Sequence, residues 1–230
     1  MQPNETDIDV IIPVCNEEEM IGTFYNRIKR LPLKLNLIFI DNASSDKTLE
    51  KIQSFEDITI IEHEVNEGYG GSILDGIKHS KGDKIVIIDA DCEYPPESIP
   101  ILINELNNFD VIYGSRFLNR ERINMPLLRV FGNKLISRLF NRLYNQEVTD
   151  LYTGFKAFKR SALYDINLEK KGFEHVLEMG IKFSQKKIPI NEVSIEYTPR
   201  SAGQSKMKHI TETLKFSYYL LAFKFKLNQA

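Results

Sequence analysis

The sequence is organised around residues 84–96, which read Lys84-Ile85-Val86-Ile87-Ile88-Asp89-Ala90-Asp91-Cys92-Glu93-Tyr94-Pro95-Pro96. The four consecutive β-branched residues before Asp89 predict a strand that is buried on both faces of a parallel sheet. At its end, Asp89 and Asp91 can turn toward one point and, with Glu93, concentrate three negative charges there. An all-oxygen cluster of this kind selects Mg²⁺ or Mn²⁺ and leaves room for phosphate oxygens. Read alone, an Asp-x-Asp is more often a solvated acidic turn before a helix, here one starting near Pro96.

Length and composition limit the classes of protein to consider. A chain of 230 residues suits one α/β domain with a sizeable core, and its formal charge of −2 gives no sign of nucleic-acid binding. Cys15 and Cys92 lie far apart without a CxxC pattern, which favours reduced thiols in the cytosol. Residues 1–9 do not resemble a signal peptide, and no run reaches the roughly 20 apolar residues of a spanning helix. We therefore expect a cytoplasmic protein that is soluble or bound to the cytosolic face of a membrane.

Strand and helix patterns alternate through the first hundred residues. We expect strands at 10–13, 37–40, 58–61 and 85–88, with helices at about 17–30 and 47–55 and another that reaches Ser80. This alternation predicts a mostly parallel sheet with helices on both faces, in which ligands bind beyond the carboxyl ends of the strands. Three polar loops would then line one crevice, at 15–17, 41–46 and 89–93.

The second half is expected to add strands at 111–113, after Asp150 and at 188–197, and helices at 173–186 and about 209–226. Between Arg116 and Arg142 there are seven Lys or Arg residues against one acid, and leucines and Phe131 recur among them at helical spacing. Such a basic amphipathic helix either lies on an anionic membrane or packs one face on the core. Both readings stay open at this point.

Glycine-rich and histidine motifs exclude several enzyme classes. The glycines of residues 66–72 follow the third strand, whereas a dinucleotide fingerprint requires them directly after the first. The sequence contains neither a P-loop motif nor an HExxH motif. We interpret the glycines at 68–71 as a tight turn rather than a ligand contact.

Other candidate site residues are polar groups near the predicted strand ends. Asp41 and Glu17 can accept hydrogen bonds from a nucleobase or ribose, although each alone is more often a helix cap or turn residue. Arg116, Arg200 and Lys206 can bind phosphate groups, and residues 200–206 are typical either of a loop that closes on an anion or of a solvated surface loop. Candidates for contacting a sugar or acceptor are Asp150, Glu174 and Glu178.

Seven motifs follow one another between about Asp7 and Lys206: Pro13-Val14-Cys15-Asn16-Glu17-Glu18, Asp41-Asn42-Ala43-Ser44-Ser45-Asp46-Lys47-Thr48, Asn66-Glu67-Gly68, Asp89-Ala90-Asp91, Gly114-Ser115-Arg116-Phe117, Asp150-x-x-Thr153-Gly154-Phe155-Lys156 and Arg200-x-x-Gly203-x-Ser205-Lys206. In order and spacing they resemble glycosyltransferase family 2, above all its dolichyl- and polyprenyl-phosphate mannose or glucose synthases. The resemblance implies a GT-A fold, a nucleotide-diphosphate sugar donor, a divalent metal and inversion at the anomeric carbon.

The resemblance also assigns positions. It implies nucleotide-sugar contacts at Pro13, Cys15, Glu17, Asp41, Asp89 and Ala90, metal ligation by Asp89, Asp91 and Glu93, and phosphate or acceptor contacts at Arg116, Arg200 and Lys206. The candidate catalytic residues are Asp91, Asp150 and Arg116. Asn42 stands where a second Asp is common and Glu93 where Gln is frequent, and the transmembrane helices that many members carry after the catalytic domain are missing from the sequence.

On this basis we expect a catalytic domain at residues 1–206, followed by a C-terminal amphipathic helix at 207–230 that packs on the domain or on a membrane surface. The expected activity is metal-dependent (Mg²⁺ or Mn²⁺) transfer of a hexose from a GDP-mannose or UDP-glucose type donor to a polyprenyl or dolichyl phosphate at the membrane. Alternatives are transfer to a hydroxyl of a glycan or other acceptor, and a non-catalytic sugar-nucleotide-binding subunit. We expect no nucleic-acid partner, whereas a membrane-anchoring partner or a homo-oligomer fits the pattern.

Overall fold

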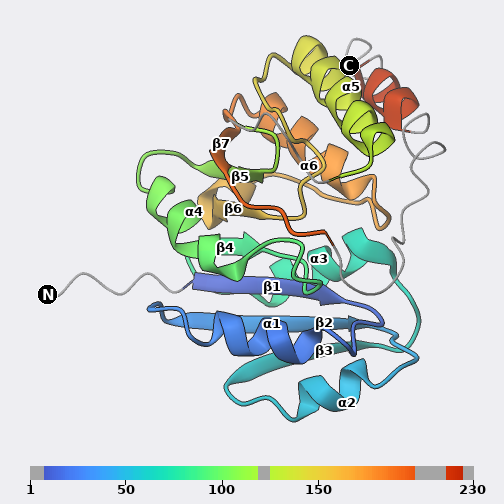
Figure 1. Ribbon diagram of the computed structural model, residues 1–230. Helices are drawn as coiled ribbons and strands as arrows, with labels where there is room; N and C mark the ends of the chain where they lie inside the picture. The colour runs from blue at the N-terminus through green and yellow to red at the C-terminus, as the bar shows by residue number, and fades with distance from the viewer. Residues whose placement is uncertain (1–7, 119–124, 200–215, 225–230) are drawn as a thin grey trace, which may run out of the picture.

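Strands and helices alternate along residues 8–118, 125–199 and 216–224, the parts of the chain that the computed structural model describes (Figure 1). The strands are β1 Ile8–Val14, β2 Leu35–Asn42, β3 Ile58–His63, β4 Lys84–Ile87, β5 Val111–Ser115, β6 Lys156–Lys159 and β7 Asn191–Ser194. The helices are α1 Ile21–Ile28, α2 Thr48–Gln53, α3 Gly68–His79, α4 Ile99–Glu105, α5 Leu127–Tyr144 and α6 His175–Gln185, with short 3₁₀ segments η1 Pro96–Ser98 and η2 Arg160–Leu163. A last helical stretch covers residues 216–224.

The strands form one sheet in the order β3-β2-β1-β4-β6-β5-β7. β1 pairs in parallel with β2 and β4, β2 pairs in parallel with β3, and β5 pairs in parallel with β7. β6 lies antiparallel between β4 and β5, so it alone of these strands runs in the opposite direction. The carboxyl ends of β1, β2, β4 and β5 therefore meet at the edge where β6 begins. The predicted mostly parallel sheet is confirmed.

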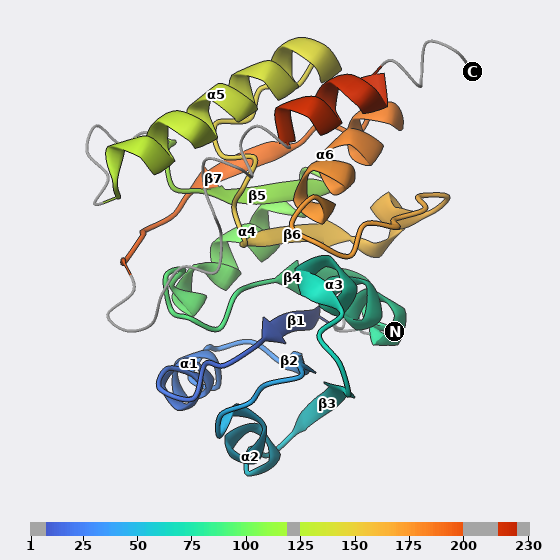
Figure 2. The same ribbon diagram turned by 90° about the vertical axis from the view of Figure 1, so that its right-hand side faces the viewer.

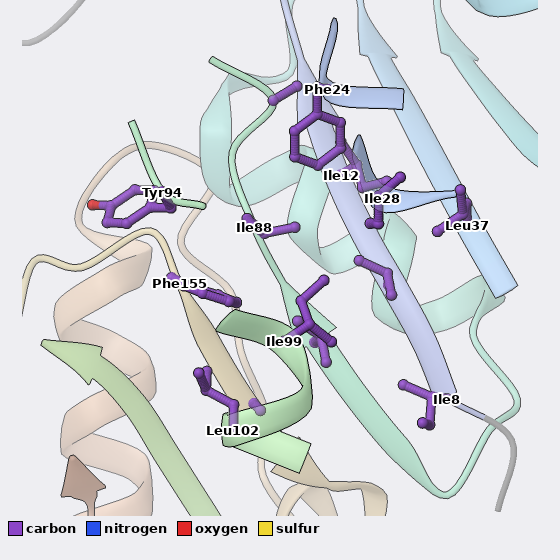
Figure 3. Packing of buried hydrophobic residues seen from close by; sticks show 14 of the residues in the cluster. Ile8, Ile12, Phe24, Ile28, Leu37, Ile88, Tyr94, Ile99, Leu102 and Phe155 are labelled. Carbon is purple, nitrogen blue, oxygen red and sulfur yellow. The ribbon is translucent and has the colours of Figure 1, made fainter. Parts of the chain in front are cut away.

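Helices cover both faces of the sheet (Figure 2). Side chains of α1, α2 and α4 pack in one apolar cluster, and those of α3, α5, α6 and residues 216–224 pack in the other. β4 and the residue that follows it contribute to both, because Val86 and Ile88 belong to the first cluster and Ile85 and Ile87 to the second. All four side chains are at most 1% exposed, as expected for a strand buried on both faces. Figure 3 shows Ile88 within the first cluster, near Phe24 and Ile99.

Three predicted boundaries were wrong. The strand expected at 188–197 is shorter, since β7 covers only Asn191–Ser194. The helix expected to open at Glu17 begins at Ile21, because residues 18–20 form a turn in which the Glu17 carbonyl accepts the backbone N–H of Ile21 at 2.9 Å. The expected turn at residues 68–71 is the first turn of α3. Its glycines allow close packing, since a Cβ on Gly70 would lie 2.3 Å from the Lys170 carbonyl oxygen.

The C-terminal helical stretch packs beside α5, as both views show (Figures 1 and 2). Phe216 and Leu220 are buried, and the Tyr144 hydroxyl donates a hydrogen bond to the Leu220 carbonyl at 2.9 Å. The helix predicted at 209–226 is described only over 216–224. Among the described residues, no helix combines the length and apolarity needed to cross a membrane.

Candidate active site

Asp41 lies at the carboxyl end of β2, next to β1, where Pro13 is paired with Ile40. Its side chain is 1% exposed, and Oδ2 accepts the backbone N–H of Ser44 at 3.1 Å. The other oxygen, Oδ1, is buried and has no hydrogen-bond partner within the described residues. Leaving a buried acceptor unpaired costs about 1–3 kcal/mol. Asp41 therefore presents an acceptor suited to a donor group on a ligand.

The loops after β1 and β2 are joined by hydrogen bonds between backbone and side chains. Asn16 receives the Ser45 N–H at 2.7 Å and donates its own N–H to the Ser44 hydroxyl at 3.0 Å. The backbone N–H of Glu17 donates to the Thr48 hydroxyl at 2.8 Å. The structure thus brings two of the three predicted polar loops together and fixes their backbones against each other.

Asn42 extends this network to the loop before α3. Its Oδ1 accepts the backbone N–H of Glu67 at 2.8 Å and lies 3.2 Å from His63 Nδ1, while its Nδ2 donates to Asn66 Oδ1 at 3.1 Å. The half-buried Cys15 lies on the same side, with Sγ 3.9 Å from Asn66 Nδ2. An aspartate at position 42 would lose the amide donor that holds Asn66.

Asp89 follows β4 and lies against two residues from other parts of the chain. The Tyr69 hydroxyl donates to Asp89 Oδ1 at 3.0 Å. The Gly154 backbone approaches so closely that a Cβ there would lie 2.1 Å from Asp89 Oδ2. Burial and then the neighbouring charge of Asp91 raise the pKa of Asp89 to about 7. Asp89 is therefore the point at which the α3 side and the β6 side of the site meet.

Asp91 and Glu93 lie two residues apart in the turn that follows. Asp91 is 6% exposed and its Oδ1 accepts the backbone N–H of Glu93 at 2.9 Å, across a left-handed residue, Cys92, with φ of 59°. Ala90 is buried, and the Tyr197 hydroxyl lies 3.4 Å from Glu93 Oε1. The described residues contain no preformed group of three or more His, Cys, Asp or Glu side chains arranged for a metal ion. Metal ligation by Asp89, Asp91 and Glu93 stays a prediction.

Arg116, at the end of β5, forms a buried ion pair with Asp150. Its Nε and Nη2 donate to the two Asp150 oxygens at 2.7 and 2.9 Å, and Asn133 of α5 donates to Oδ1 at 2.8 Å. Burial alone would lower the pKa of Arg116, but the Asp150 charge raises it above its usual range. The guanidinium carbon also lies 5.5 Å from the centre of the Tyr94 ring and 5.8 Å from that of Tyr197.

Tyr94 links this pair to Gly154. The Tyr94 hydroxyl accepts the Gly154 N–H at 2.9 Å, and its ring lies 6.1 Å from that of Phe155 (Figure 3). The path Asp89–Gly154–Tyr94–Arg116 is thus a continuous set of contacts along the sheet edge. Of these residues, only Asp89 belongs to the three loops that were predicted to line this edge, and the pairing among the four was not predicted.

Lys156 is a buried cation that the list of candidate residues missed. Its side chain is 3% exposed, its ammonium group donates to the Thr153 carbonyl, and it lies 4.9 Å from the centre of the Tyr113 ring. Burial lowers its pKa to about 8, although the charge of Asp89 acts in the opposite direction. The available signal was a lysine at the start of an apolar strand, directly after Thr153-Gly154-Phe155.

The remaining candidates divide into two groups. Glu178 accepts the backbone N–H groups of Glu169 and Lys170 at 2.9 and 2.8 Å, so it orders the chain before α6. Glu174 is the residue just before that helix. Arg200 and Lys206 lie outside the described residues.

Comparison with known proteins identifies the family of the chain. Residues 9–166 match the sequence profile of glycosyl transferase family 2. The chain belongs to glycosyltransferase family 2.

Two relatives have names that describe acceptors. A dolichol-phosphate mannosyltransferase of Pyrococcus furiosus is 30% identical over 96% of this chain and 66% of its own length. A UDP-N-acetylglucosamine–dolichyl-phosphate N-acetylglucosaminyltransferase of Methanococcus voltae is 30% identical over 94% of this chain and 96% of its own length.

A solved structure supports the fold assignment. Glucosyl-3-phosphoglycerate synthase of Mycobacterium tuberculosis, crystallised with Mn²⁺, UDP and phosphoglyceric acid, superposes with a TM-score of 0.72 at 18% identity, over 94% of this chain and 76% of that one. The mixed sheet described above is thus the GT-A fold.

Proposed function

We propose that this chain transfers a hexose from a nucleotide-diphosphate sugar to a polyprenyl or dolichyl phosphate, with inversion at the anomeric carbon. The observation that carries the donor half of this proposal is the buried Asp41 Oδ1, which lacks a partner among the described residues. Asp41 lies at the carboxyl end of β2, beside β1, and a parallel α/β sheet binds nucleotides just beyond such strand ends. A nucleobase N–H or a ribose hydroxyl satisfies it.

The acidic turn supplies hard oxygen donors at the same sheet edge, after β4, which is separated from β2 by β1. Asp91 and Glu93 fit Mg²⁺ or Mn²⁺ in chemistry, and diphosphate oxygens and water would complete the shell. When bound, the cation neutralises the leaving nucleoside diphosphate. Asp89 contributes by position, because its contacts with Tyr69 and Gly154 fix the turn from both sides.

Two observations favour a phosphate acceptor over a hydroxyl acceptor. Relatives that align with nearly all of this chain are named for dolichyl-phosphate acceptors. In addition, both oxygens of Asp150 accept hydrogen bonds from Arg116 or Asn133, so this carboxylate is poorly placed to act as a general base. A lipid phosphate is already an anion near neutral pH and needs no strong base.

The direct test is turnover of radiolabelled GDP-mannose and UDP-glucose with Mn²⁺ and polyprenyl phosphate in detergent. We expect a labelled product that partitions into organic solvent and whose sugar has the opposite anomeric configuration to the donor. Turnover only on free sugars would assign a hydroxyl acceptor instead. Nucleotide binding without any product would assign a non-catalytic subunit.

Asp91→Ala tests the metal assignment within the same assay. We expect a loss of turnover of about a thousandfold, the size typical of removing one electrostatic contact to the transition state. Asp83→Ala, which removes an exposed carboxylate just before β4, is the matched control and should retain activity. Full turnover of Asp91→Ala at saturating Mn²⁺ would refute the assignment.

A further inference from the structure

α5 buries one side and exposes apolar residues on the other. Asn133, Ile136, Ser137, Phe140 and Tyr144 face the core. The exposed fractions are 86% for Leu127, 58% for Leu128, 67% for Phe131 and 44% for Leu135. At 3.6 residues per turn these four residues fall on the side opposite the buried ones. Large apolar side chains grouped in this way on a surface mark an interaction site.

The same side of α5 is cationic. Lys134 and Arg138 are exposed between and just beyond these apolar residues, and Arg142 continues the row one turn later. The sequence of α5 contains no Asp or Glu. We name Leu127, Leu128, Phe131, Lys134, Leu135 and Arg138 the α5 outer face.

The neighbouring helical stretch has the same character. Tyr218 is 70% exposed and Leu221 is 41% exposed, and residues 216–224 include Lys224 but no acid. This stretch lies beside α5 in both views (Figures 1 and 2). Exposed apolar side chains and cations without acids therefore occur on both of these packed helices.

The α5 outer face also lies close to the candidate active site. Asn133, on the buried side of the same helical turns, donates a hydrogen bond to Asp150, which in turn holds Arg116. The exposed apolar residues thus lie about 10 Å, one helix diameter, from the side of α5 on which Asn133 contacts the Arg116–Asp150 ion pair.

We propose that the α5 outer face docks on an anionic lipid surface, with its apolar side chains in the interfacial layer and Lys134 and Arg138 against lipid phosphates. Pairing with a second copy through the same face is disfavoured, because two-fold symmetry would bring cationic helices without acids against each other. The further step, in which docking delivers a lipid-phosphate acceptor to Arg116, rests on the proposed function. The docking itself does not depend on it.

Co-sedimentation of the full chain with vesicles tests the proposal. We expect binding to phosphatidylcholine vesicles that contain phosphatidylglycerol, weaker binding to phosphatidylcholine alone, and loss of binding as salt rises. Phe131→Ser should weaken binding to the mixed vesicles about tenfold through lost apolar burial. Arg138→Glu should weaken it at least about tenfold and reduce its dependence on salt.

Matched controls exist elsewhere on the surface. Ile101, in α4, is 52% exposed, and Lys78, in α3, is also exposed. Ile101→Ser and Lys78→Glu make the same chemical changes away from the α5 outer face and should bind vesicles like the wild type. Circular dichroism of all four variants shows whether each is folded.

The outcomes separate the alternatives. Absence of vesicle binding by the wild type, or equal losses in the variants and their matched controls, would overturn the proposal. Light scattering that shows a dimer dissociated by Phe131→Ser would overturn it in favour of an interface between copies. Vesicle binding by a chain that neither binds nucleotide nor transfers sugar would leave docking intact and refute the proposed function.

Discussion

The loops after β1 and β2 and the residues around Arg116 line the same sheet edge, but they satisfy their polar groups in different ways. The first region fixes its backbone through Asn16, Asn42 and Thr48 and leaves one buried oxygen of Asp41 without a partner among the described residues. The second region pairs its central charges internally, in the bond between Arg116 and Asp150.

This difference separates two ways of building a site. A region with an unpaired buried acceptor completes its hydrogen bonds only when a ligand binds. Substitutions there should therefore change ligand affinity more than the free energy of unfolding. A region whose ion pair is closed in the free protein should affect folding first, because losing either partner leaves a buried charge. The following changes test this contrast.

The largest effect is expected from Asp150→Asn. This change keeps the shape of the side chain but leaves the Arg116 guanidinium buried without a counter-charge, so the free energy of unfolding should fall by about 3–5 kcal/mol. Urea denaturation measures it. Glu97→Gln is the control, because Glu97 makes a similar two-bond contact with Arg27 at a position where both side chains are partly exposed. Its cost should stay below about 1 kcal/mol, and equal losses would contradict the contrast.

A pH-dependent effect is expected from His175, whose ring is 1% exposed and lacks hydrogen bonds within the described residues. Burial, and then the charge of Lys156, lower its pKa to about 4. Between about pH 6.5 and 4 the unfolded state therefore binds more protons than the folded state, and stability falls as pH falls through this window, by about 3 kcal/mol in total.

His175→Leu should remove this contribution. The stability difference between wild type and variant must be measured at each pH, because the raised pKa of Asp89 acts in the opposite direction over an overlapping range. His79→Leu changes an exposed histidine and serves as the control. A difference that stays constant from pH 7 to 4 would contradict the prediction.

A smaller loss of stability is expected at Gly154, which lies between Asp89 and the Tyr94 ring beside Arg116. Gly154→Ala places a Cβ 2.1 Å from Asp89 Oδ2, and the forced shift should cost about 1–3 kcal/mol of unfolding free energy. Gly22→Ala is the matched control, since a Cβ on this α1 glycine meets no atom within 4 Å. It should instead stabilise the protein by about 0.5–1 kcal/mol through helix propensity. Thermal denaturation should therefore shift in opposite directions for the two variants.

Asp41→Asn is expected to change the free energy of unfolding least. Its effect should instead appear in the affinity for a ligand. Weakening the acceptor at position 41 should reduce affinity for the matching nucleoside diphosphate by about tenfold, as for loss of one charge-assisted hydrogen bond. Calorimetry with GDP and UDP measures this and identifies the base. Asp57→Asn, at a strongly exposed carboxylate, should leave affinity unchanged. Unchanged binding in Asp41→Asn would remove Asp41 from the donor site.

The sequence allowed the sheet and the common edge to be predicted because β-branched runs such as residues 85–88 have few alternatives to a buried strand. The position of β6 between β4 and β5 was not predictable in this way, because it depends on pairing between Lys84 and Lys159, far apart in the chain. The Arg116–Asp150 ion pair likewise joins residues 34 positions apart, and the local sequence pattern around either residue does not indicate its partner. The helical state of residues 68–71 was missed because packing against residues 170–172 overrides the usual preference of glycine for turns.

The insertion of β6 beside β4 also bears on how the chain is made. β4 acquires its second neighbour only after residue 159 has been synthesised, so its edge, which includes Ile85, Val86 and Ile87, stays open while the intervening segment leaves the ribosome. A nascent chain that pauses before this point exposes an apolar strand edge suited to pairing with another chain. Truncation before β6 should accordingly yield insoluble material rather than an isolated nucleotide-binding fragment.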